Sequence, residues 1–342
     1  MLLIAAGALA IALVSGLRYE QTQRARDQAD FPQIGRSIDI GGGRKLNIFC
    51  SGTGQPAVIF ESGAPWPFYD PKEMFENGAP RPGYGWVAIQ RELAKTTTAC
   101  WYDRAGSGWS DLGPYPRDSA SQARDLHALL QAAGVPPPYV LVAELSAALD
   151  ARVYAGSWPA EVAGLVFVNG VHPDFMIGTR PAARRQALLP GFVFHSEDAM
   201  AQVFNEVGFF RLGLPNRPAP APLPNGMTPS EWNTVWYLNQ SAKAHSALLQ
   251  DVSAWQRSTA EARAAGSLGN RPLVVLSAEN AAMPSEYSSV WKELQTDLAG
   301  LSTRGKQTTV DLSGGDLTWQ APDAIIEATR QVVSDVRQPR TP

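Results

Sequence analysis

Residues 139–155 read Tyr-Val-Leu-Val-Ala-Glu-Leu-Ser-Ala-Ala-Leu-Asp-Ala-Arg-Val-Tyr-Ala, and this stretch decides the fold. Its first four residues form a short apolar run with β-branched members, which is typical of a buried strand. From Ser146 onward, the apolar residues Leu149, Val153 and Tyr154 recur at helical spacing. Only a tight turn separates the two patterns. We therefore predict a strand, a sharp turn and a helix in direct succession.

The rest of the chain repeats this alternation of strand-like and helix-like segments. Residues 36–49 have the pattern of a hairpin that turns at 41–43, where three glycines follow one another. An amphipathic pattern at 121–133 and the closing stretch 322–336 are typical of helices. Strands that alternate with helices favour a mainly parallel sheet covered on both faces. Further strands are expected at 56–61, 97–102, 162–169, 271–277 and 307–312.

The turn after the strand at 139–142 resembles the nucleophile elbow of the α/β-hydrolases, whose motif is G-x-S-x-G. An alignment without gaps puts Leu145 at the serine and puts Ala143 and Ala147 at the glycines. Residues 102–110, Tyr-Asp-Arg-Ala-Gly-Ser-Gly-Trp-Ser, resemble the D-R-x-G-x-G-x-S segment of the same family, where it is structural. The resemblance implies an α/β-hydrolase fold with a helical cap insertion.

The same resemblance divides the chain into a core and a cap. The core comprises residues 36–170 and 271–338, and the proline-rich, otherwise helix-like stretch 171–270 stands where the family inserts its cap. The cap is expected to cover the carboxyl ends of the strands, where open α/β sheets bind ligands.

The resemblance also implies that the catalytic triad has been replaced. In this fold the serine, the acid and the histidine follow one another along the chain. The acid position, after the strand at 273–277, is Asn280, and the histidine position is Gly315. Asn169, where some relatives place the acid, is also an amide. With Leu145 as the third replacement, the standard site has no nucleophile, no carboxylate and no base. We expect Leu145 to point toward Gly315.

Other residues around the turn offer weaker candidates. The oxyanion-hole positions of the family correspond to Gly63, Ala64 and Ser146. Ser146 with His172 is a non-standard catalytic pair, although Ser146 fits an N-cap of the following helix better. Without a nucleophile to present, the turn is expected to relax from its strained form.

Composition narrows the range of partners. The chain has 342 residues and a formal net charge of −3, so no basic face for nucleic acid is indicated. No metal-ligand cluster, phosphate loop or dinucleotide fingerprint stands out, so neither a metal nor a cofactor is expected. The expected partner is a small apolar or ester-like ligand, and any protein partner stays open.

The N-terminal residues 2–17 carry no charge. Their number lies between the core of a signal peptide and a full transmembrane helix. We predict an uncleaved membrane anchor, with a cleaved signal as the alternative, followed by a polar linker at 18–35. Arg18, Arg24 and Arg26 directly after the run favour a cytoplasmic flank by the positive-inside rule.

The two cysteines indicate the opposite orientation. Cys50 and Cys100 end or lie within strand-like runs that are neighbours in the α/β-hydrolase sheet, so the resemblance implies a disulfide between them. Disulfides form in oxidising compartments. An extracytoplasmic soluble domain is therefore expected, while two buried free thiols and a cytoplasmic domain remain the alternatives.

Three functions are compatible with these patterns. The first is a membrane-anchored, catalytically inactive pseudo-hydrolase that keeps a pocket for a ligand or a partner. The second is an active esterase or lipase-like hydrolase with a non-standard site. The third is a structural membrane-anchored domain. A fold by itself does not decide among them.

Overall fold

An eight-stranded sheet in the order β1-β2-β4-β3-β5-β6-β7-β8 forms the centre of the computed structural model. The structure describes residues 2–64, 81–175, 206–207, 223–224, 226–239, 241–279, 285–312 and 316–338. β1 and β2 pair antiparallel, as do β2 and β4, and all other neighbours pair parallel, which confirms the predicted mainly parallel sheet. The strands are β1 (Arg36–Asp39), β2 (Lys45–Ser51), β3 (Ala57–Glu61), β4 (Ala99–Tyr102), β5 (Tyr139–Glu144), β6 (Val162–Val168), β7 (Gly269–Glu279) and β8 (Ser302–Asp311).

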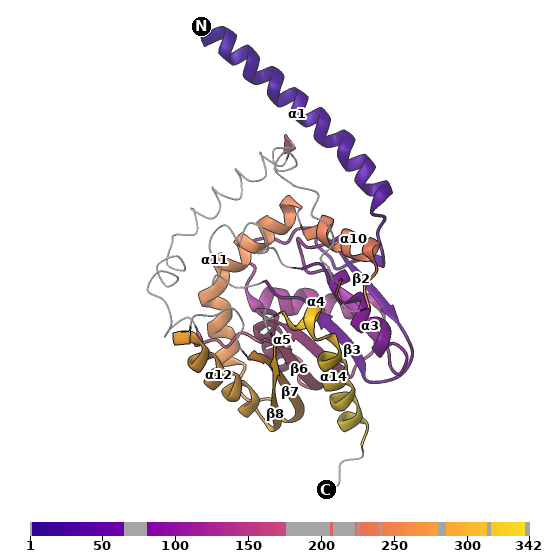
Figure 1. The fold of residues 1–342 in the computed structure, drawn as a ribbon, viewed down its shortest axis with the longest axis vertical. Helices are drawn as coiled ribbons and strands as arrows, with labels where there is room; N and C mark the ends of the chain where they lie inside the picture. The colour runs from indigo at the N-terminus through magenta and orange to yellow at the C-terminus, as the bar shows by residue number, and fades with distance from the viewer. Residues whose placement is uncertain are drawn as a thin grey trace.

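Helices cover both faces of this sheet (Figure 1). Side chains alternate along β3, so that Ala57 and Ile59 join one buried cluster while Val58 and Phe60 join the other. The first cluster is completed by α4 (Ser119–Ala133), α5 (Ala147–Ser157), α11 (Ala242–Ala264) and α12 (Ser285–Gly300). The second is completed by η1 (Gly83–Trp86), α3 (Val87–Leu93), α10 (Pro229–Asn239), α13 (Leu317–Gln320) and α14 (Pro322–Arg337).

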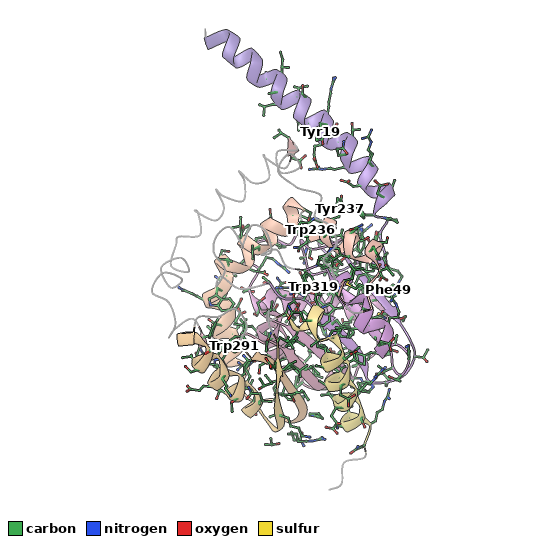
Figure 2. The ribbon with its side chains drawn as sticks, viewed as in Figure 1. Tyr19, Phe49, Trp236, Tyr237, Trp291 and Trp319 are labelled. Carbon is green, nitrogen blue, oxygen red and sulfur yellow. A yellow bond between two sulfur atoms is a disulfide. The ribbon has the colours of Figure 1, made fainter. Side chains whose placement is uncertain are left out.

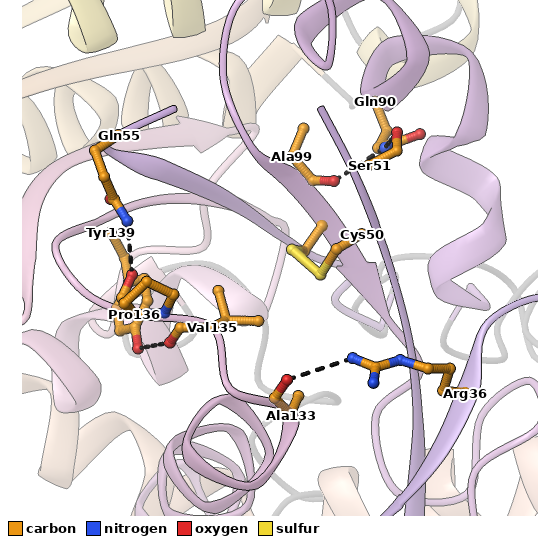
Figure 3. The surroundings of a disulfide bond; sticks show 11 residues. Arg36, Cys50, Ser51, Gln55, Gln90, Ala99, Ala133, Val135, Pro136 and Tyr139 are labelled. Carbon is orange, nitrogen blue, oxygen red and sulfur yellow. Dashed lines mark hydrogen bonds between the residues drawn. A yellow bond between two sulfur atoms is a disulfide. The ribbon is translucent and has the colours of Figure 1, made fainter. Parts of the chain in front are cut away.

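The predicted disulfide between Cys50 and Cys100 is confirmed. The two residues are register partners on the antiparallel strands β2 and β4, and their Cα atoms are 4.1 Å apart. Figure 3 shows the bond between the two strands, with the side chain of Gln90 reaching the carbonyl of Ala99 and the hydroxyl of Ser51 beside it. The cross-link fixes the register of the antiparallel edge of the sheet.

The described part of the predicted cap is mainly helical. α10 and α11 account for most of it, whereas residues 176–205 and 208–222 lie outside the described residues. Trp255 and Ala262 of α11 are buried in the same apolar cluster as α4 and α5. The backbone N–H of Ser119 also donates to Ser258 Oγ at 3.0 Å. α11 therefore belongs to the layer that covers one face of the sheet.

The N-terminal segment is one long helix, α1 (Leu2–Asp30), which extends away from the body in Figure 1. Most of the predicted linker is thus helical, because residues 18–30 are mainly good helix formers. An i,i+4 pair between Glu20 and Arg24, 2.9 Å apart, supports this part of the helix. Among the described residues, no helix combines the length and the apolarity that crossing a bilayer requires. Membrane attachment stays a prediction.

Candidate functional site

The turn between β5 and α5 keeps a strained backbone although it carries leucine. Leu145 has a φ of +50°, a conformation that costs a residue with a side chain roughly 1 kcal/mol or more. Its N–H donates to the carbonyl of Val168 at 3.0 Å, and its carbonyl accepts from the N–H groups of Ala148 and Val171. The expectation that this turn relaxes is wrong, because β6 and the residues after it hold the turn on both sides.

The Leu145 side chain is half-buried and packs against the apolar cluster on the α4–α5 face of the sheet. Asn280 and Gly315, the other two residues that we predicted to replace the triad, lie outside the described residues, so the predicted approach of Leu145 to Gly315 is untested. Asn169 is described. Its Oδ1 accepts from the N–H of Ala278 at 2.8 Å, which ties the end of β6 to β7.

The loop after β3 lies directly against the elbow. A Cβ atom on Gly63 would stand 2.2 Å from the carbonyl oxygen of Glu144 and 2.6 Å from the nitrogen of Ala147, so only glycine fits. The next residue, Ala64, donates its N–H to Ser146 Oγ at 2.9 Å. The structure thus brings together all three oxyanion-hole candidates.

Ser146 does not act as predicted at the start of α5. It occupies the N-cap position, but its side chain caps no helical N–H. Its φ of −64° and ψ of −24° are already helical, whereas a capping side chain requires an extended backbone. The hydroxyl instead accepts the N–H of Ala64. The predicted cap interaction is therefore wrong, because the Ser146 hydroxyl is hydrogen-bonded to the loop after β3 and not to the first turn of α5.

His172 lies beyond the end of β6, and both of its ring nitrogens are occupied. Nδ1 accepts from the N–H of Asp174 at 3.0 Å, and Nε2 lies 2.8 Å from Asp297 Oδ2. Nε2 therefore carries the proton and donates it to the carboxylate. Burial lowers the pKa of the imidazole. No ring nitrogen is left to accept a proton from Ser146.

A buried ionic network lies beneath Ser146. Arg104 Nη2 stands 3.1 Å from a carboxylate oxygen of Asp150 and 3.2 Å from one of Asp251. Burial opposes the charge of Arg104, but these two carboxylates raise its pKa. At the end of β3, burial raises the pKa of Glu61 to about 7, while Arg104 and the Tyr102 hydroxyl, 2.6 Å from Glu61 Oε1, act in the opposite direction.

The space beside this network is too small for a substrate. A cavity of about 10 Å³ lies between Ser146, Asp150 and Asp251. A single water molecule needs at least about 10–15 Å³. An ester group cannot reach the Ser146 hydroxyl from this side.

A second polar cluster joins three distant segments next to the elbow. Glu144, the last residue of β5, is buried, and its Oε1 lies 3.1 Å from Arg81 Nη1. The other terminal nitrogen of Arg81 lies 3.0 Å from Asp316 Oδ2, and the guanidinium carbon stands 4.4 Å from the ring centroid of Trp319. Trp319, labelled in Figure 2, belongs to the short helix α13, and its side chain is half-buried. We name these four residues the Arg81 cluster.

The charge of the Arg81 cluster is unbalanced. One guanidinium is shared by two carboxylates, and the hydroxyl of Thr318 donates to Glu144 Oε1 at 2.5 Å. Burial raises the pKa of Glu144, and Arg81 opposes that shift. Sequence reasoning missed this cluster. Its one local signal was a carboxylate at the end of the otherwise apolar run of β5.

No protein-family model matches the chain. Solved structures match it over most of its length. An alpha/beta hydrolase fold protein from Burkholderia ambifaria aligns over its whole length with 87% of this chain, at 17% identity and a TM-score of 0.56. A thermophilic esterase from Thermogutta terrifontis aligns over its whole length with 90% of this chain, at 17% identity and a TM-score of 0.55. In Cfl2 from Burkholderia cenocepacia, 94% of that protein aligns with 86% of this chain, at 18% identity and a TM-score of 0.60. The chain has the α/β-hydrolase fold.

Curated relatives match shorter parts of the chain. The uncharacterized protein YbdG of Bacillus subtilis is 23% identical over 158 residues, which are 46% of this chain and 44% of that protein. An AB hydrolase superfamily protein of Gibberella zeae is 33% identical over 88 residues, 25% of this chain and 27% of its own. The chain thus spans less than half the length of these relatives.

Two residues of the Arg81 cluster are sequence neighbours of positions that we predicted to replace the catalytic triad. Glu144 directly precedes Leu145, and Asp316 directly follows Gly315 in the sequence. Two ion pairs of Arg81 therefore link the residue before Leu145 to the residue after Gly315. Among the described residues, no group of three or more His, Cys, Asp and Glu side chains is arranged to hold a metal ion.

Proposed function

We propose that this α/β-hydrolase-fold protein is a pseudo-hydrolase, which binds a ligand at the carboxyl edge of the sheet and does not hydrolyse it. The observation that carries the proposal is Leu145 at a φ of +50°, in the elbow geometry that presents a nucleophile elsewhere in this fold. A hydrocarbon side chain cannot attack a carbonyl group.

Two further observations support inactivity over a non-standard hydrolase. The Ala64 N–H, which would stabilise an oxyanion, already donates to Ser146 Oγ. The Ser146–His172 pair lacks a base, since both imidazole nitrogens of His172 are engaged by Asp174 and Asp297.

We further propose that α1 attaches the protein to a membrane and that the folded domain is extracytoplasmic. Ile11, Leu13, Val14 and Leu17 of α1 expose 37–69% of their surface, which suits insertion into the apolar part of a bilayer. The disulfide between β2 and β4 supports an oxidising compartment. Vesicle flotation of the full chain tests the attachment. A chain lacking residues 2–17 should stay unbound, and equal flotation of both would contradict it.

A serine-directed fluorophosphonate probe tests whether the chain has a reactive serine. The full chain should remain unlabelled, and p-nitrophenyl acetate should not be turned over above the rate in buffer. Leu145→Ser should remain inactive, because no imidazole is expected beside position 145 to accept the proton. An active serine hydrolase serves as the labelling control. Labelling of the wild type that disappears in Ser146→Ala would refute the proposal in favour of an active, non-standard enzyme.

A further inference from the structure

The Arg81 cluster surrounds one cation on three sides. Glu144 and Asp316 hold the two terminal nitrogens of Arg81 at 3.1 and 3.0 Å, and Trp319 lies under the guanidinium plane at 4.4 Å. Carboxylates paired with an aromatic face are the groups with which proteins recognise organic cations. The cluster lies at the carboxyl end of β5, the edge at which open α/β sheets bind ligands.

Arg81 binds only one of the two carboxylate oxygens of Glu144. Its guanidinium and the Thr318 hydroxyl both bind Oε1 of Glu144, whereas Oε2 is buried and has no hydrogen-bond partner. A buried polar atom without a partner costs about 1–3 kcal/mol. A guanidinium that is free of the protein backbone can turn to bind both oxygens of the carboxylate at once.

The charge of the Arg81 cluster also favours an organic cation as the ligand. Glu144 and Asp316 supply two carboxylates for the single charge of Arg81. An added anion would be repelled by this excess, and an added cation would be attracted. The indole ring of Trp232, 4.7 Å from that of Trp319, extends the apolar wall beside it.

We infer that the Arg81 cluster is a recognition site for a ligand with a guanidinium group, and that the chain's own Arg81 occupies it when the ligand is absent. The ligand guanidinium takes the place of the Arg81 side chain, binds both oxygens of Glu144 and stacks on Trp319. This inference rests on the proposed function, since it names the ligand class of the binding site.

Calorimetric titration with methylguanidinium tests the site. Arg81→Ala, which removes the internal cation, should bind methylguanidinium at least about tenfold more tightly than the wild type, because a vacated pair of carboxylates gains a bidentate partner. Arg81→Ala with Glu144→Gln should lose that gain. Arg91→Ala, which breaks the exposed ion pair with Glu231, is the matched control and should leave binding at the wild-type level.

The pH dependence provides a second readout. In Arg81→Ala, the affinity should rise with pH, because a cation binds the ionised form of Glu144, whose pKa is raised by burial. Arg81→Met, which keeps apolar contact with Trp319, replaces Arg81→Ala if the latter does not fold. No gain in either variant, or a gain that survives Glu144→Gln, would overturn the inference. Fluorophosphonate labelling tests the proposed function separately.

Discussion

The elbow and the segment at 103–110 preserve the fold in opposite ways. The segment at 103–110 contains the residues that the resemblance to the α/β-hydrolases implies, and its first residue, Asp103, forms hydrogen bonds with backbone N–H groups. The buried carboxylate of Asp103 accepts from the N–H groups of Gly83 and Trp109 and from Asn47 Nδ2, at 2.6–3.0 Å. At the elbow, Leu145 replaces the expected serine, and yet the backbone keeps its strained turn.

This difference shows which groups determine the shape of each region. At the segment, a side chain organises the surrounding backbone, so the residue type is essential to the structure. At the elbow, the turn is fixed by the Leu145 N–H, which donates to Val168, by the N–H groups of Ala148 and Val171, which donate to the Leu145 carbonyl, and by the close contact of Gly63. Leucine can therefore occupy this turn without loss of the elbow geometry, whereas Asp103 cannot be replaced so easily.

The largest effect is expected from Asp103→Ala. The variant removes the acceptor of the N–H groups of Gly83 and Trp109 and one of the two acceptors of Asn47 Nδ2. An orphaned donor costs about 1–3 kcal/mol, so the free energy of unfolding should fall on the order of 4 kcal/mol. Urea denaturation measures it. Asp111→Ala, which loses an exposed bond to the N–H of Lys45, is the control and should lose less than about 1 kcal/mol. Equal losses in the two variants would show that Asp103 does not organise the segment.

Removal of the cross-link should have the next largest effect. β4 carries Cys100 and leads directly into the segment at 103–110. The disulfide closes a loop of 50 residues, and loss of such a loop constraint costs about 4 kcal/mol in the chain-entropy model. Cys50→Ala with Cys100→Ala should lower the urea midpoint accordingly, and reductant should then have no further effect. A midpoint unchanged from that of the oxidised wild type would contradict this expectation.

Glu61→Gln should change how stability depends on pH. Burial raises the pKa of Glu61 from its ordinary value of 4.5 to about 7 in the folded protein. The wild type therefore loses stability as the pH rises from about 4.5, where the unfolded carboxyl ionises, to about 7, and the loss is complete above that pH. Relative to the wild type, Glu61→Gln should gain on the order of 2 kcal/mol between about pH 5 and pH 8. Thermal unfolding across this range measures the difference. The exposed Glu327→Gln should show no such trend, and parallel curves for all three proteins would contradict the expectation.

The smallest effect should appear at the elbow itself. Leu145→Ala and Leu145→Gly both lose the leucine packing, but glycine also relieves the positive φ. We expect Leu145→Gly to be more stable than Leu145→Ala by about 1 kcal/mol. At Ala151, inside α5, glycine should instead be less stable than alanine. If glycine were the less stable residue at both positions, the strain at Leu145 would be refuted.

The sequence was sufficient for features that depend on local pattern or on adjacent strands. The apolar run at 139–142 and the helical spacing after Ser146 placed β5 and α5 around the turn, and the pairing of Cys50 with Cys100 followed from the resemblance. The positive φ of Leu145 was not predictable, because it is imposed by carbonyl and N–H groups of β6 and of residues after it. The helix through residues 18–30 was missed because a polar composition was taken to indicate a linker.

The Arg81 cluster could not be predicted for a related reason. Arg81 and Asp316 are 235 residues apart, and their ion pair depends on where two loops meet. Ser146 shows the same limit at shorter range. Its type and position favour an N-cap, but a backbone N–H from the loop after β3 competes successfully for the hydroxyl. Long-range partners, which no local pattern encodes, decide what these polar side chains do.

The bond from the Ala64 N–H to Ser146 Oγ has a consequence for redesign. A donor that is satisfied within its own chain must give up that partner before it can stabilise developing negative charge, and this exchange reduces the gain in the transition state. An engineer who wished to install hydrolysis on this scaffold would therefore begin at Ser146 and remove a hydroxyl before adding one at Leu145. The backbone turn itself would need no redesign, since it already has the required strain.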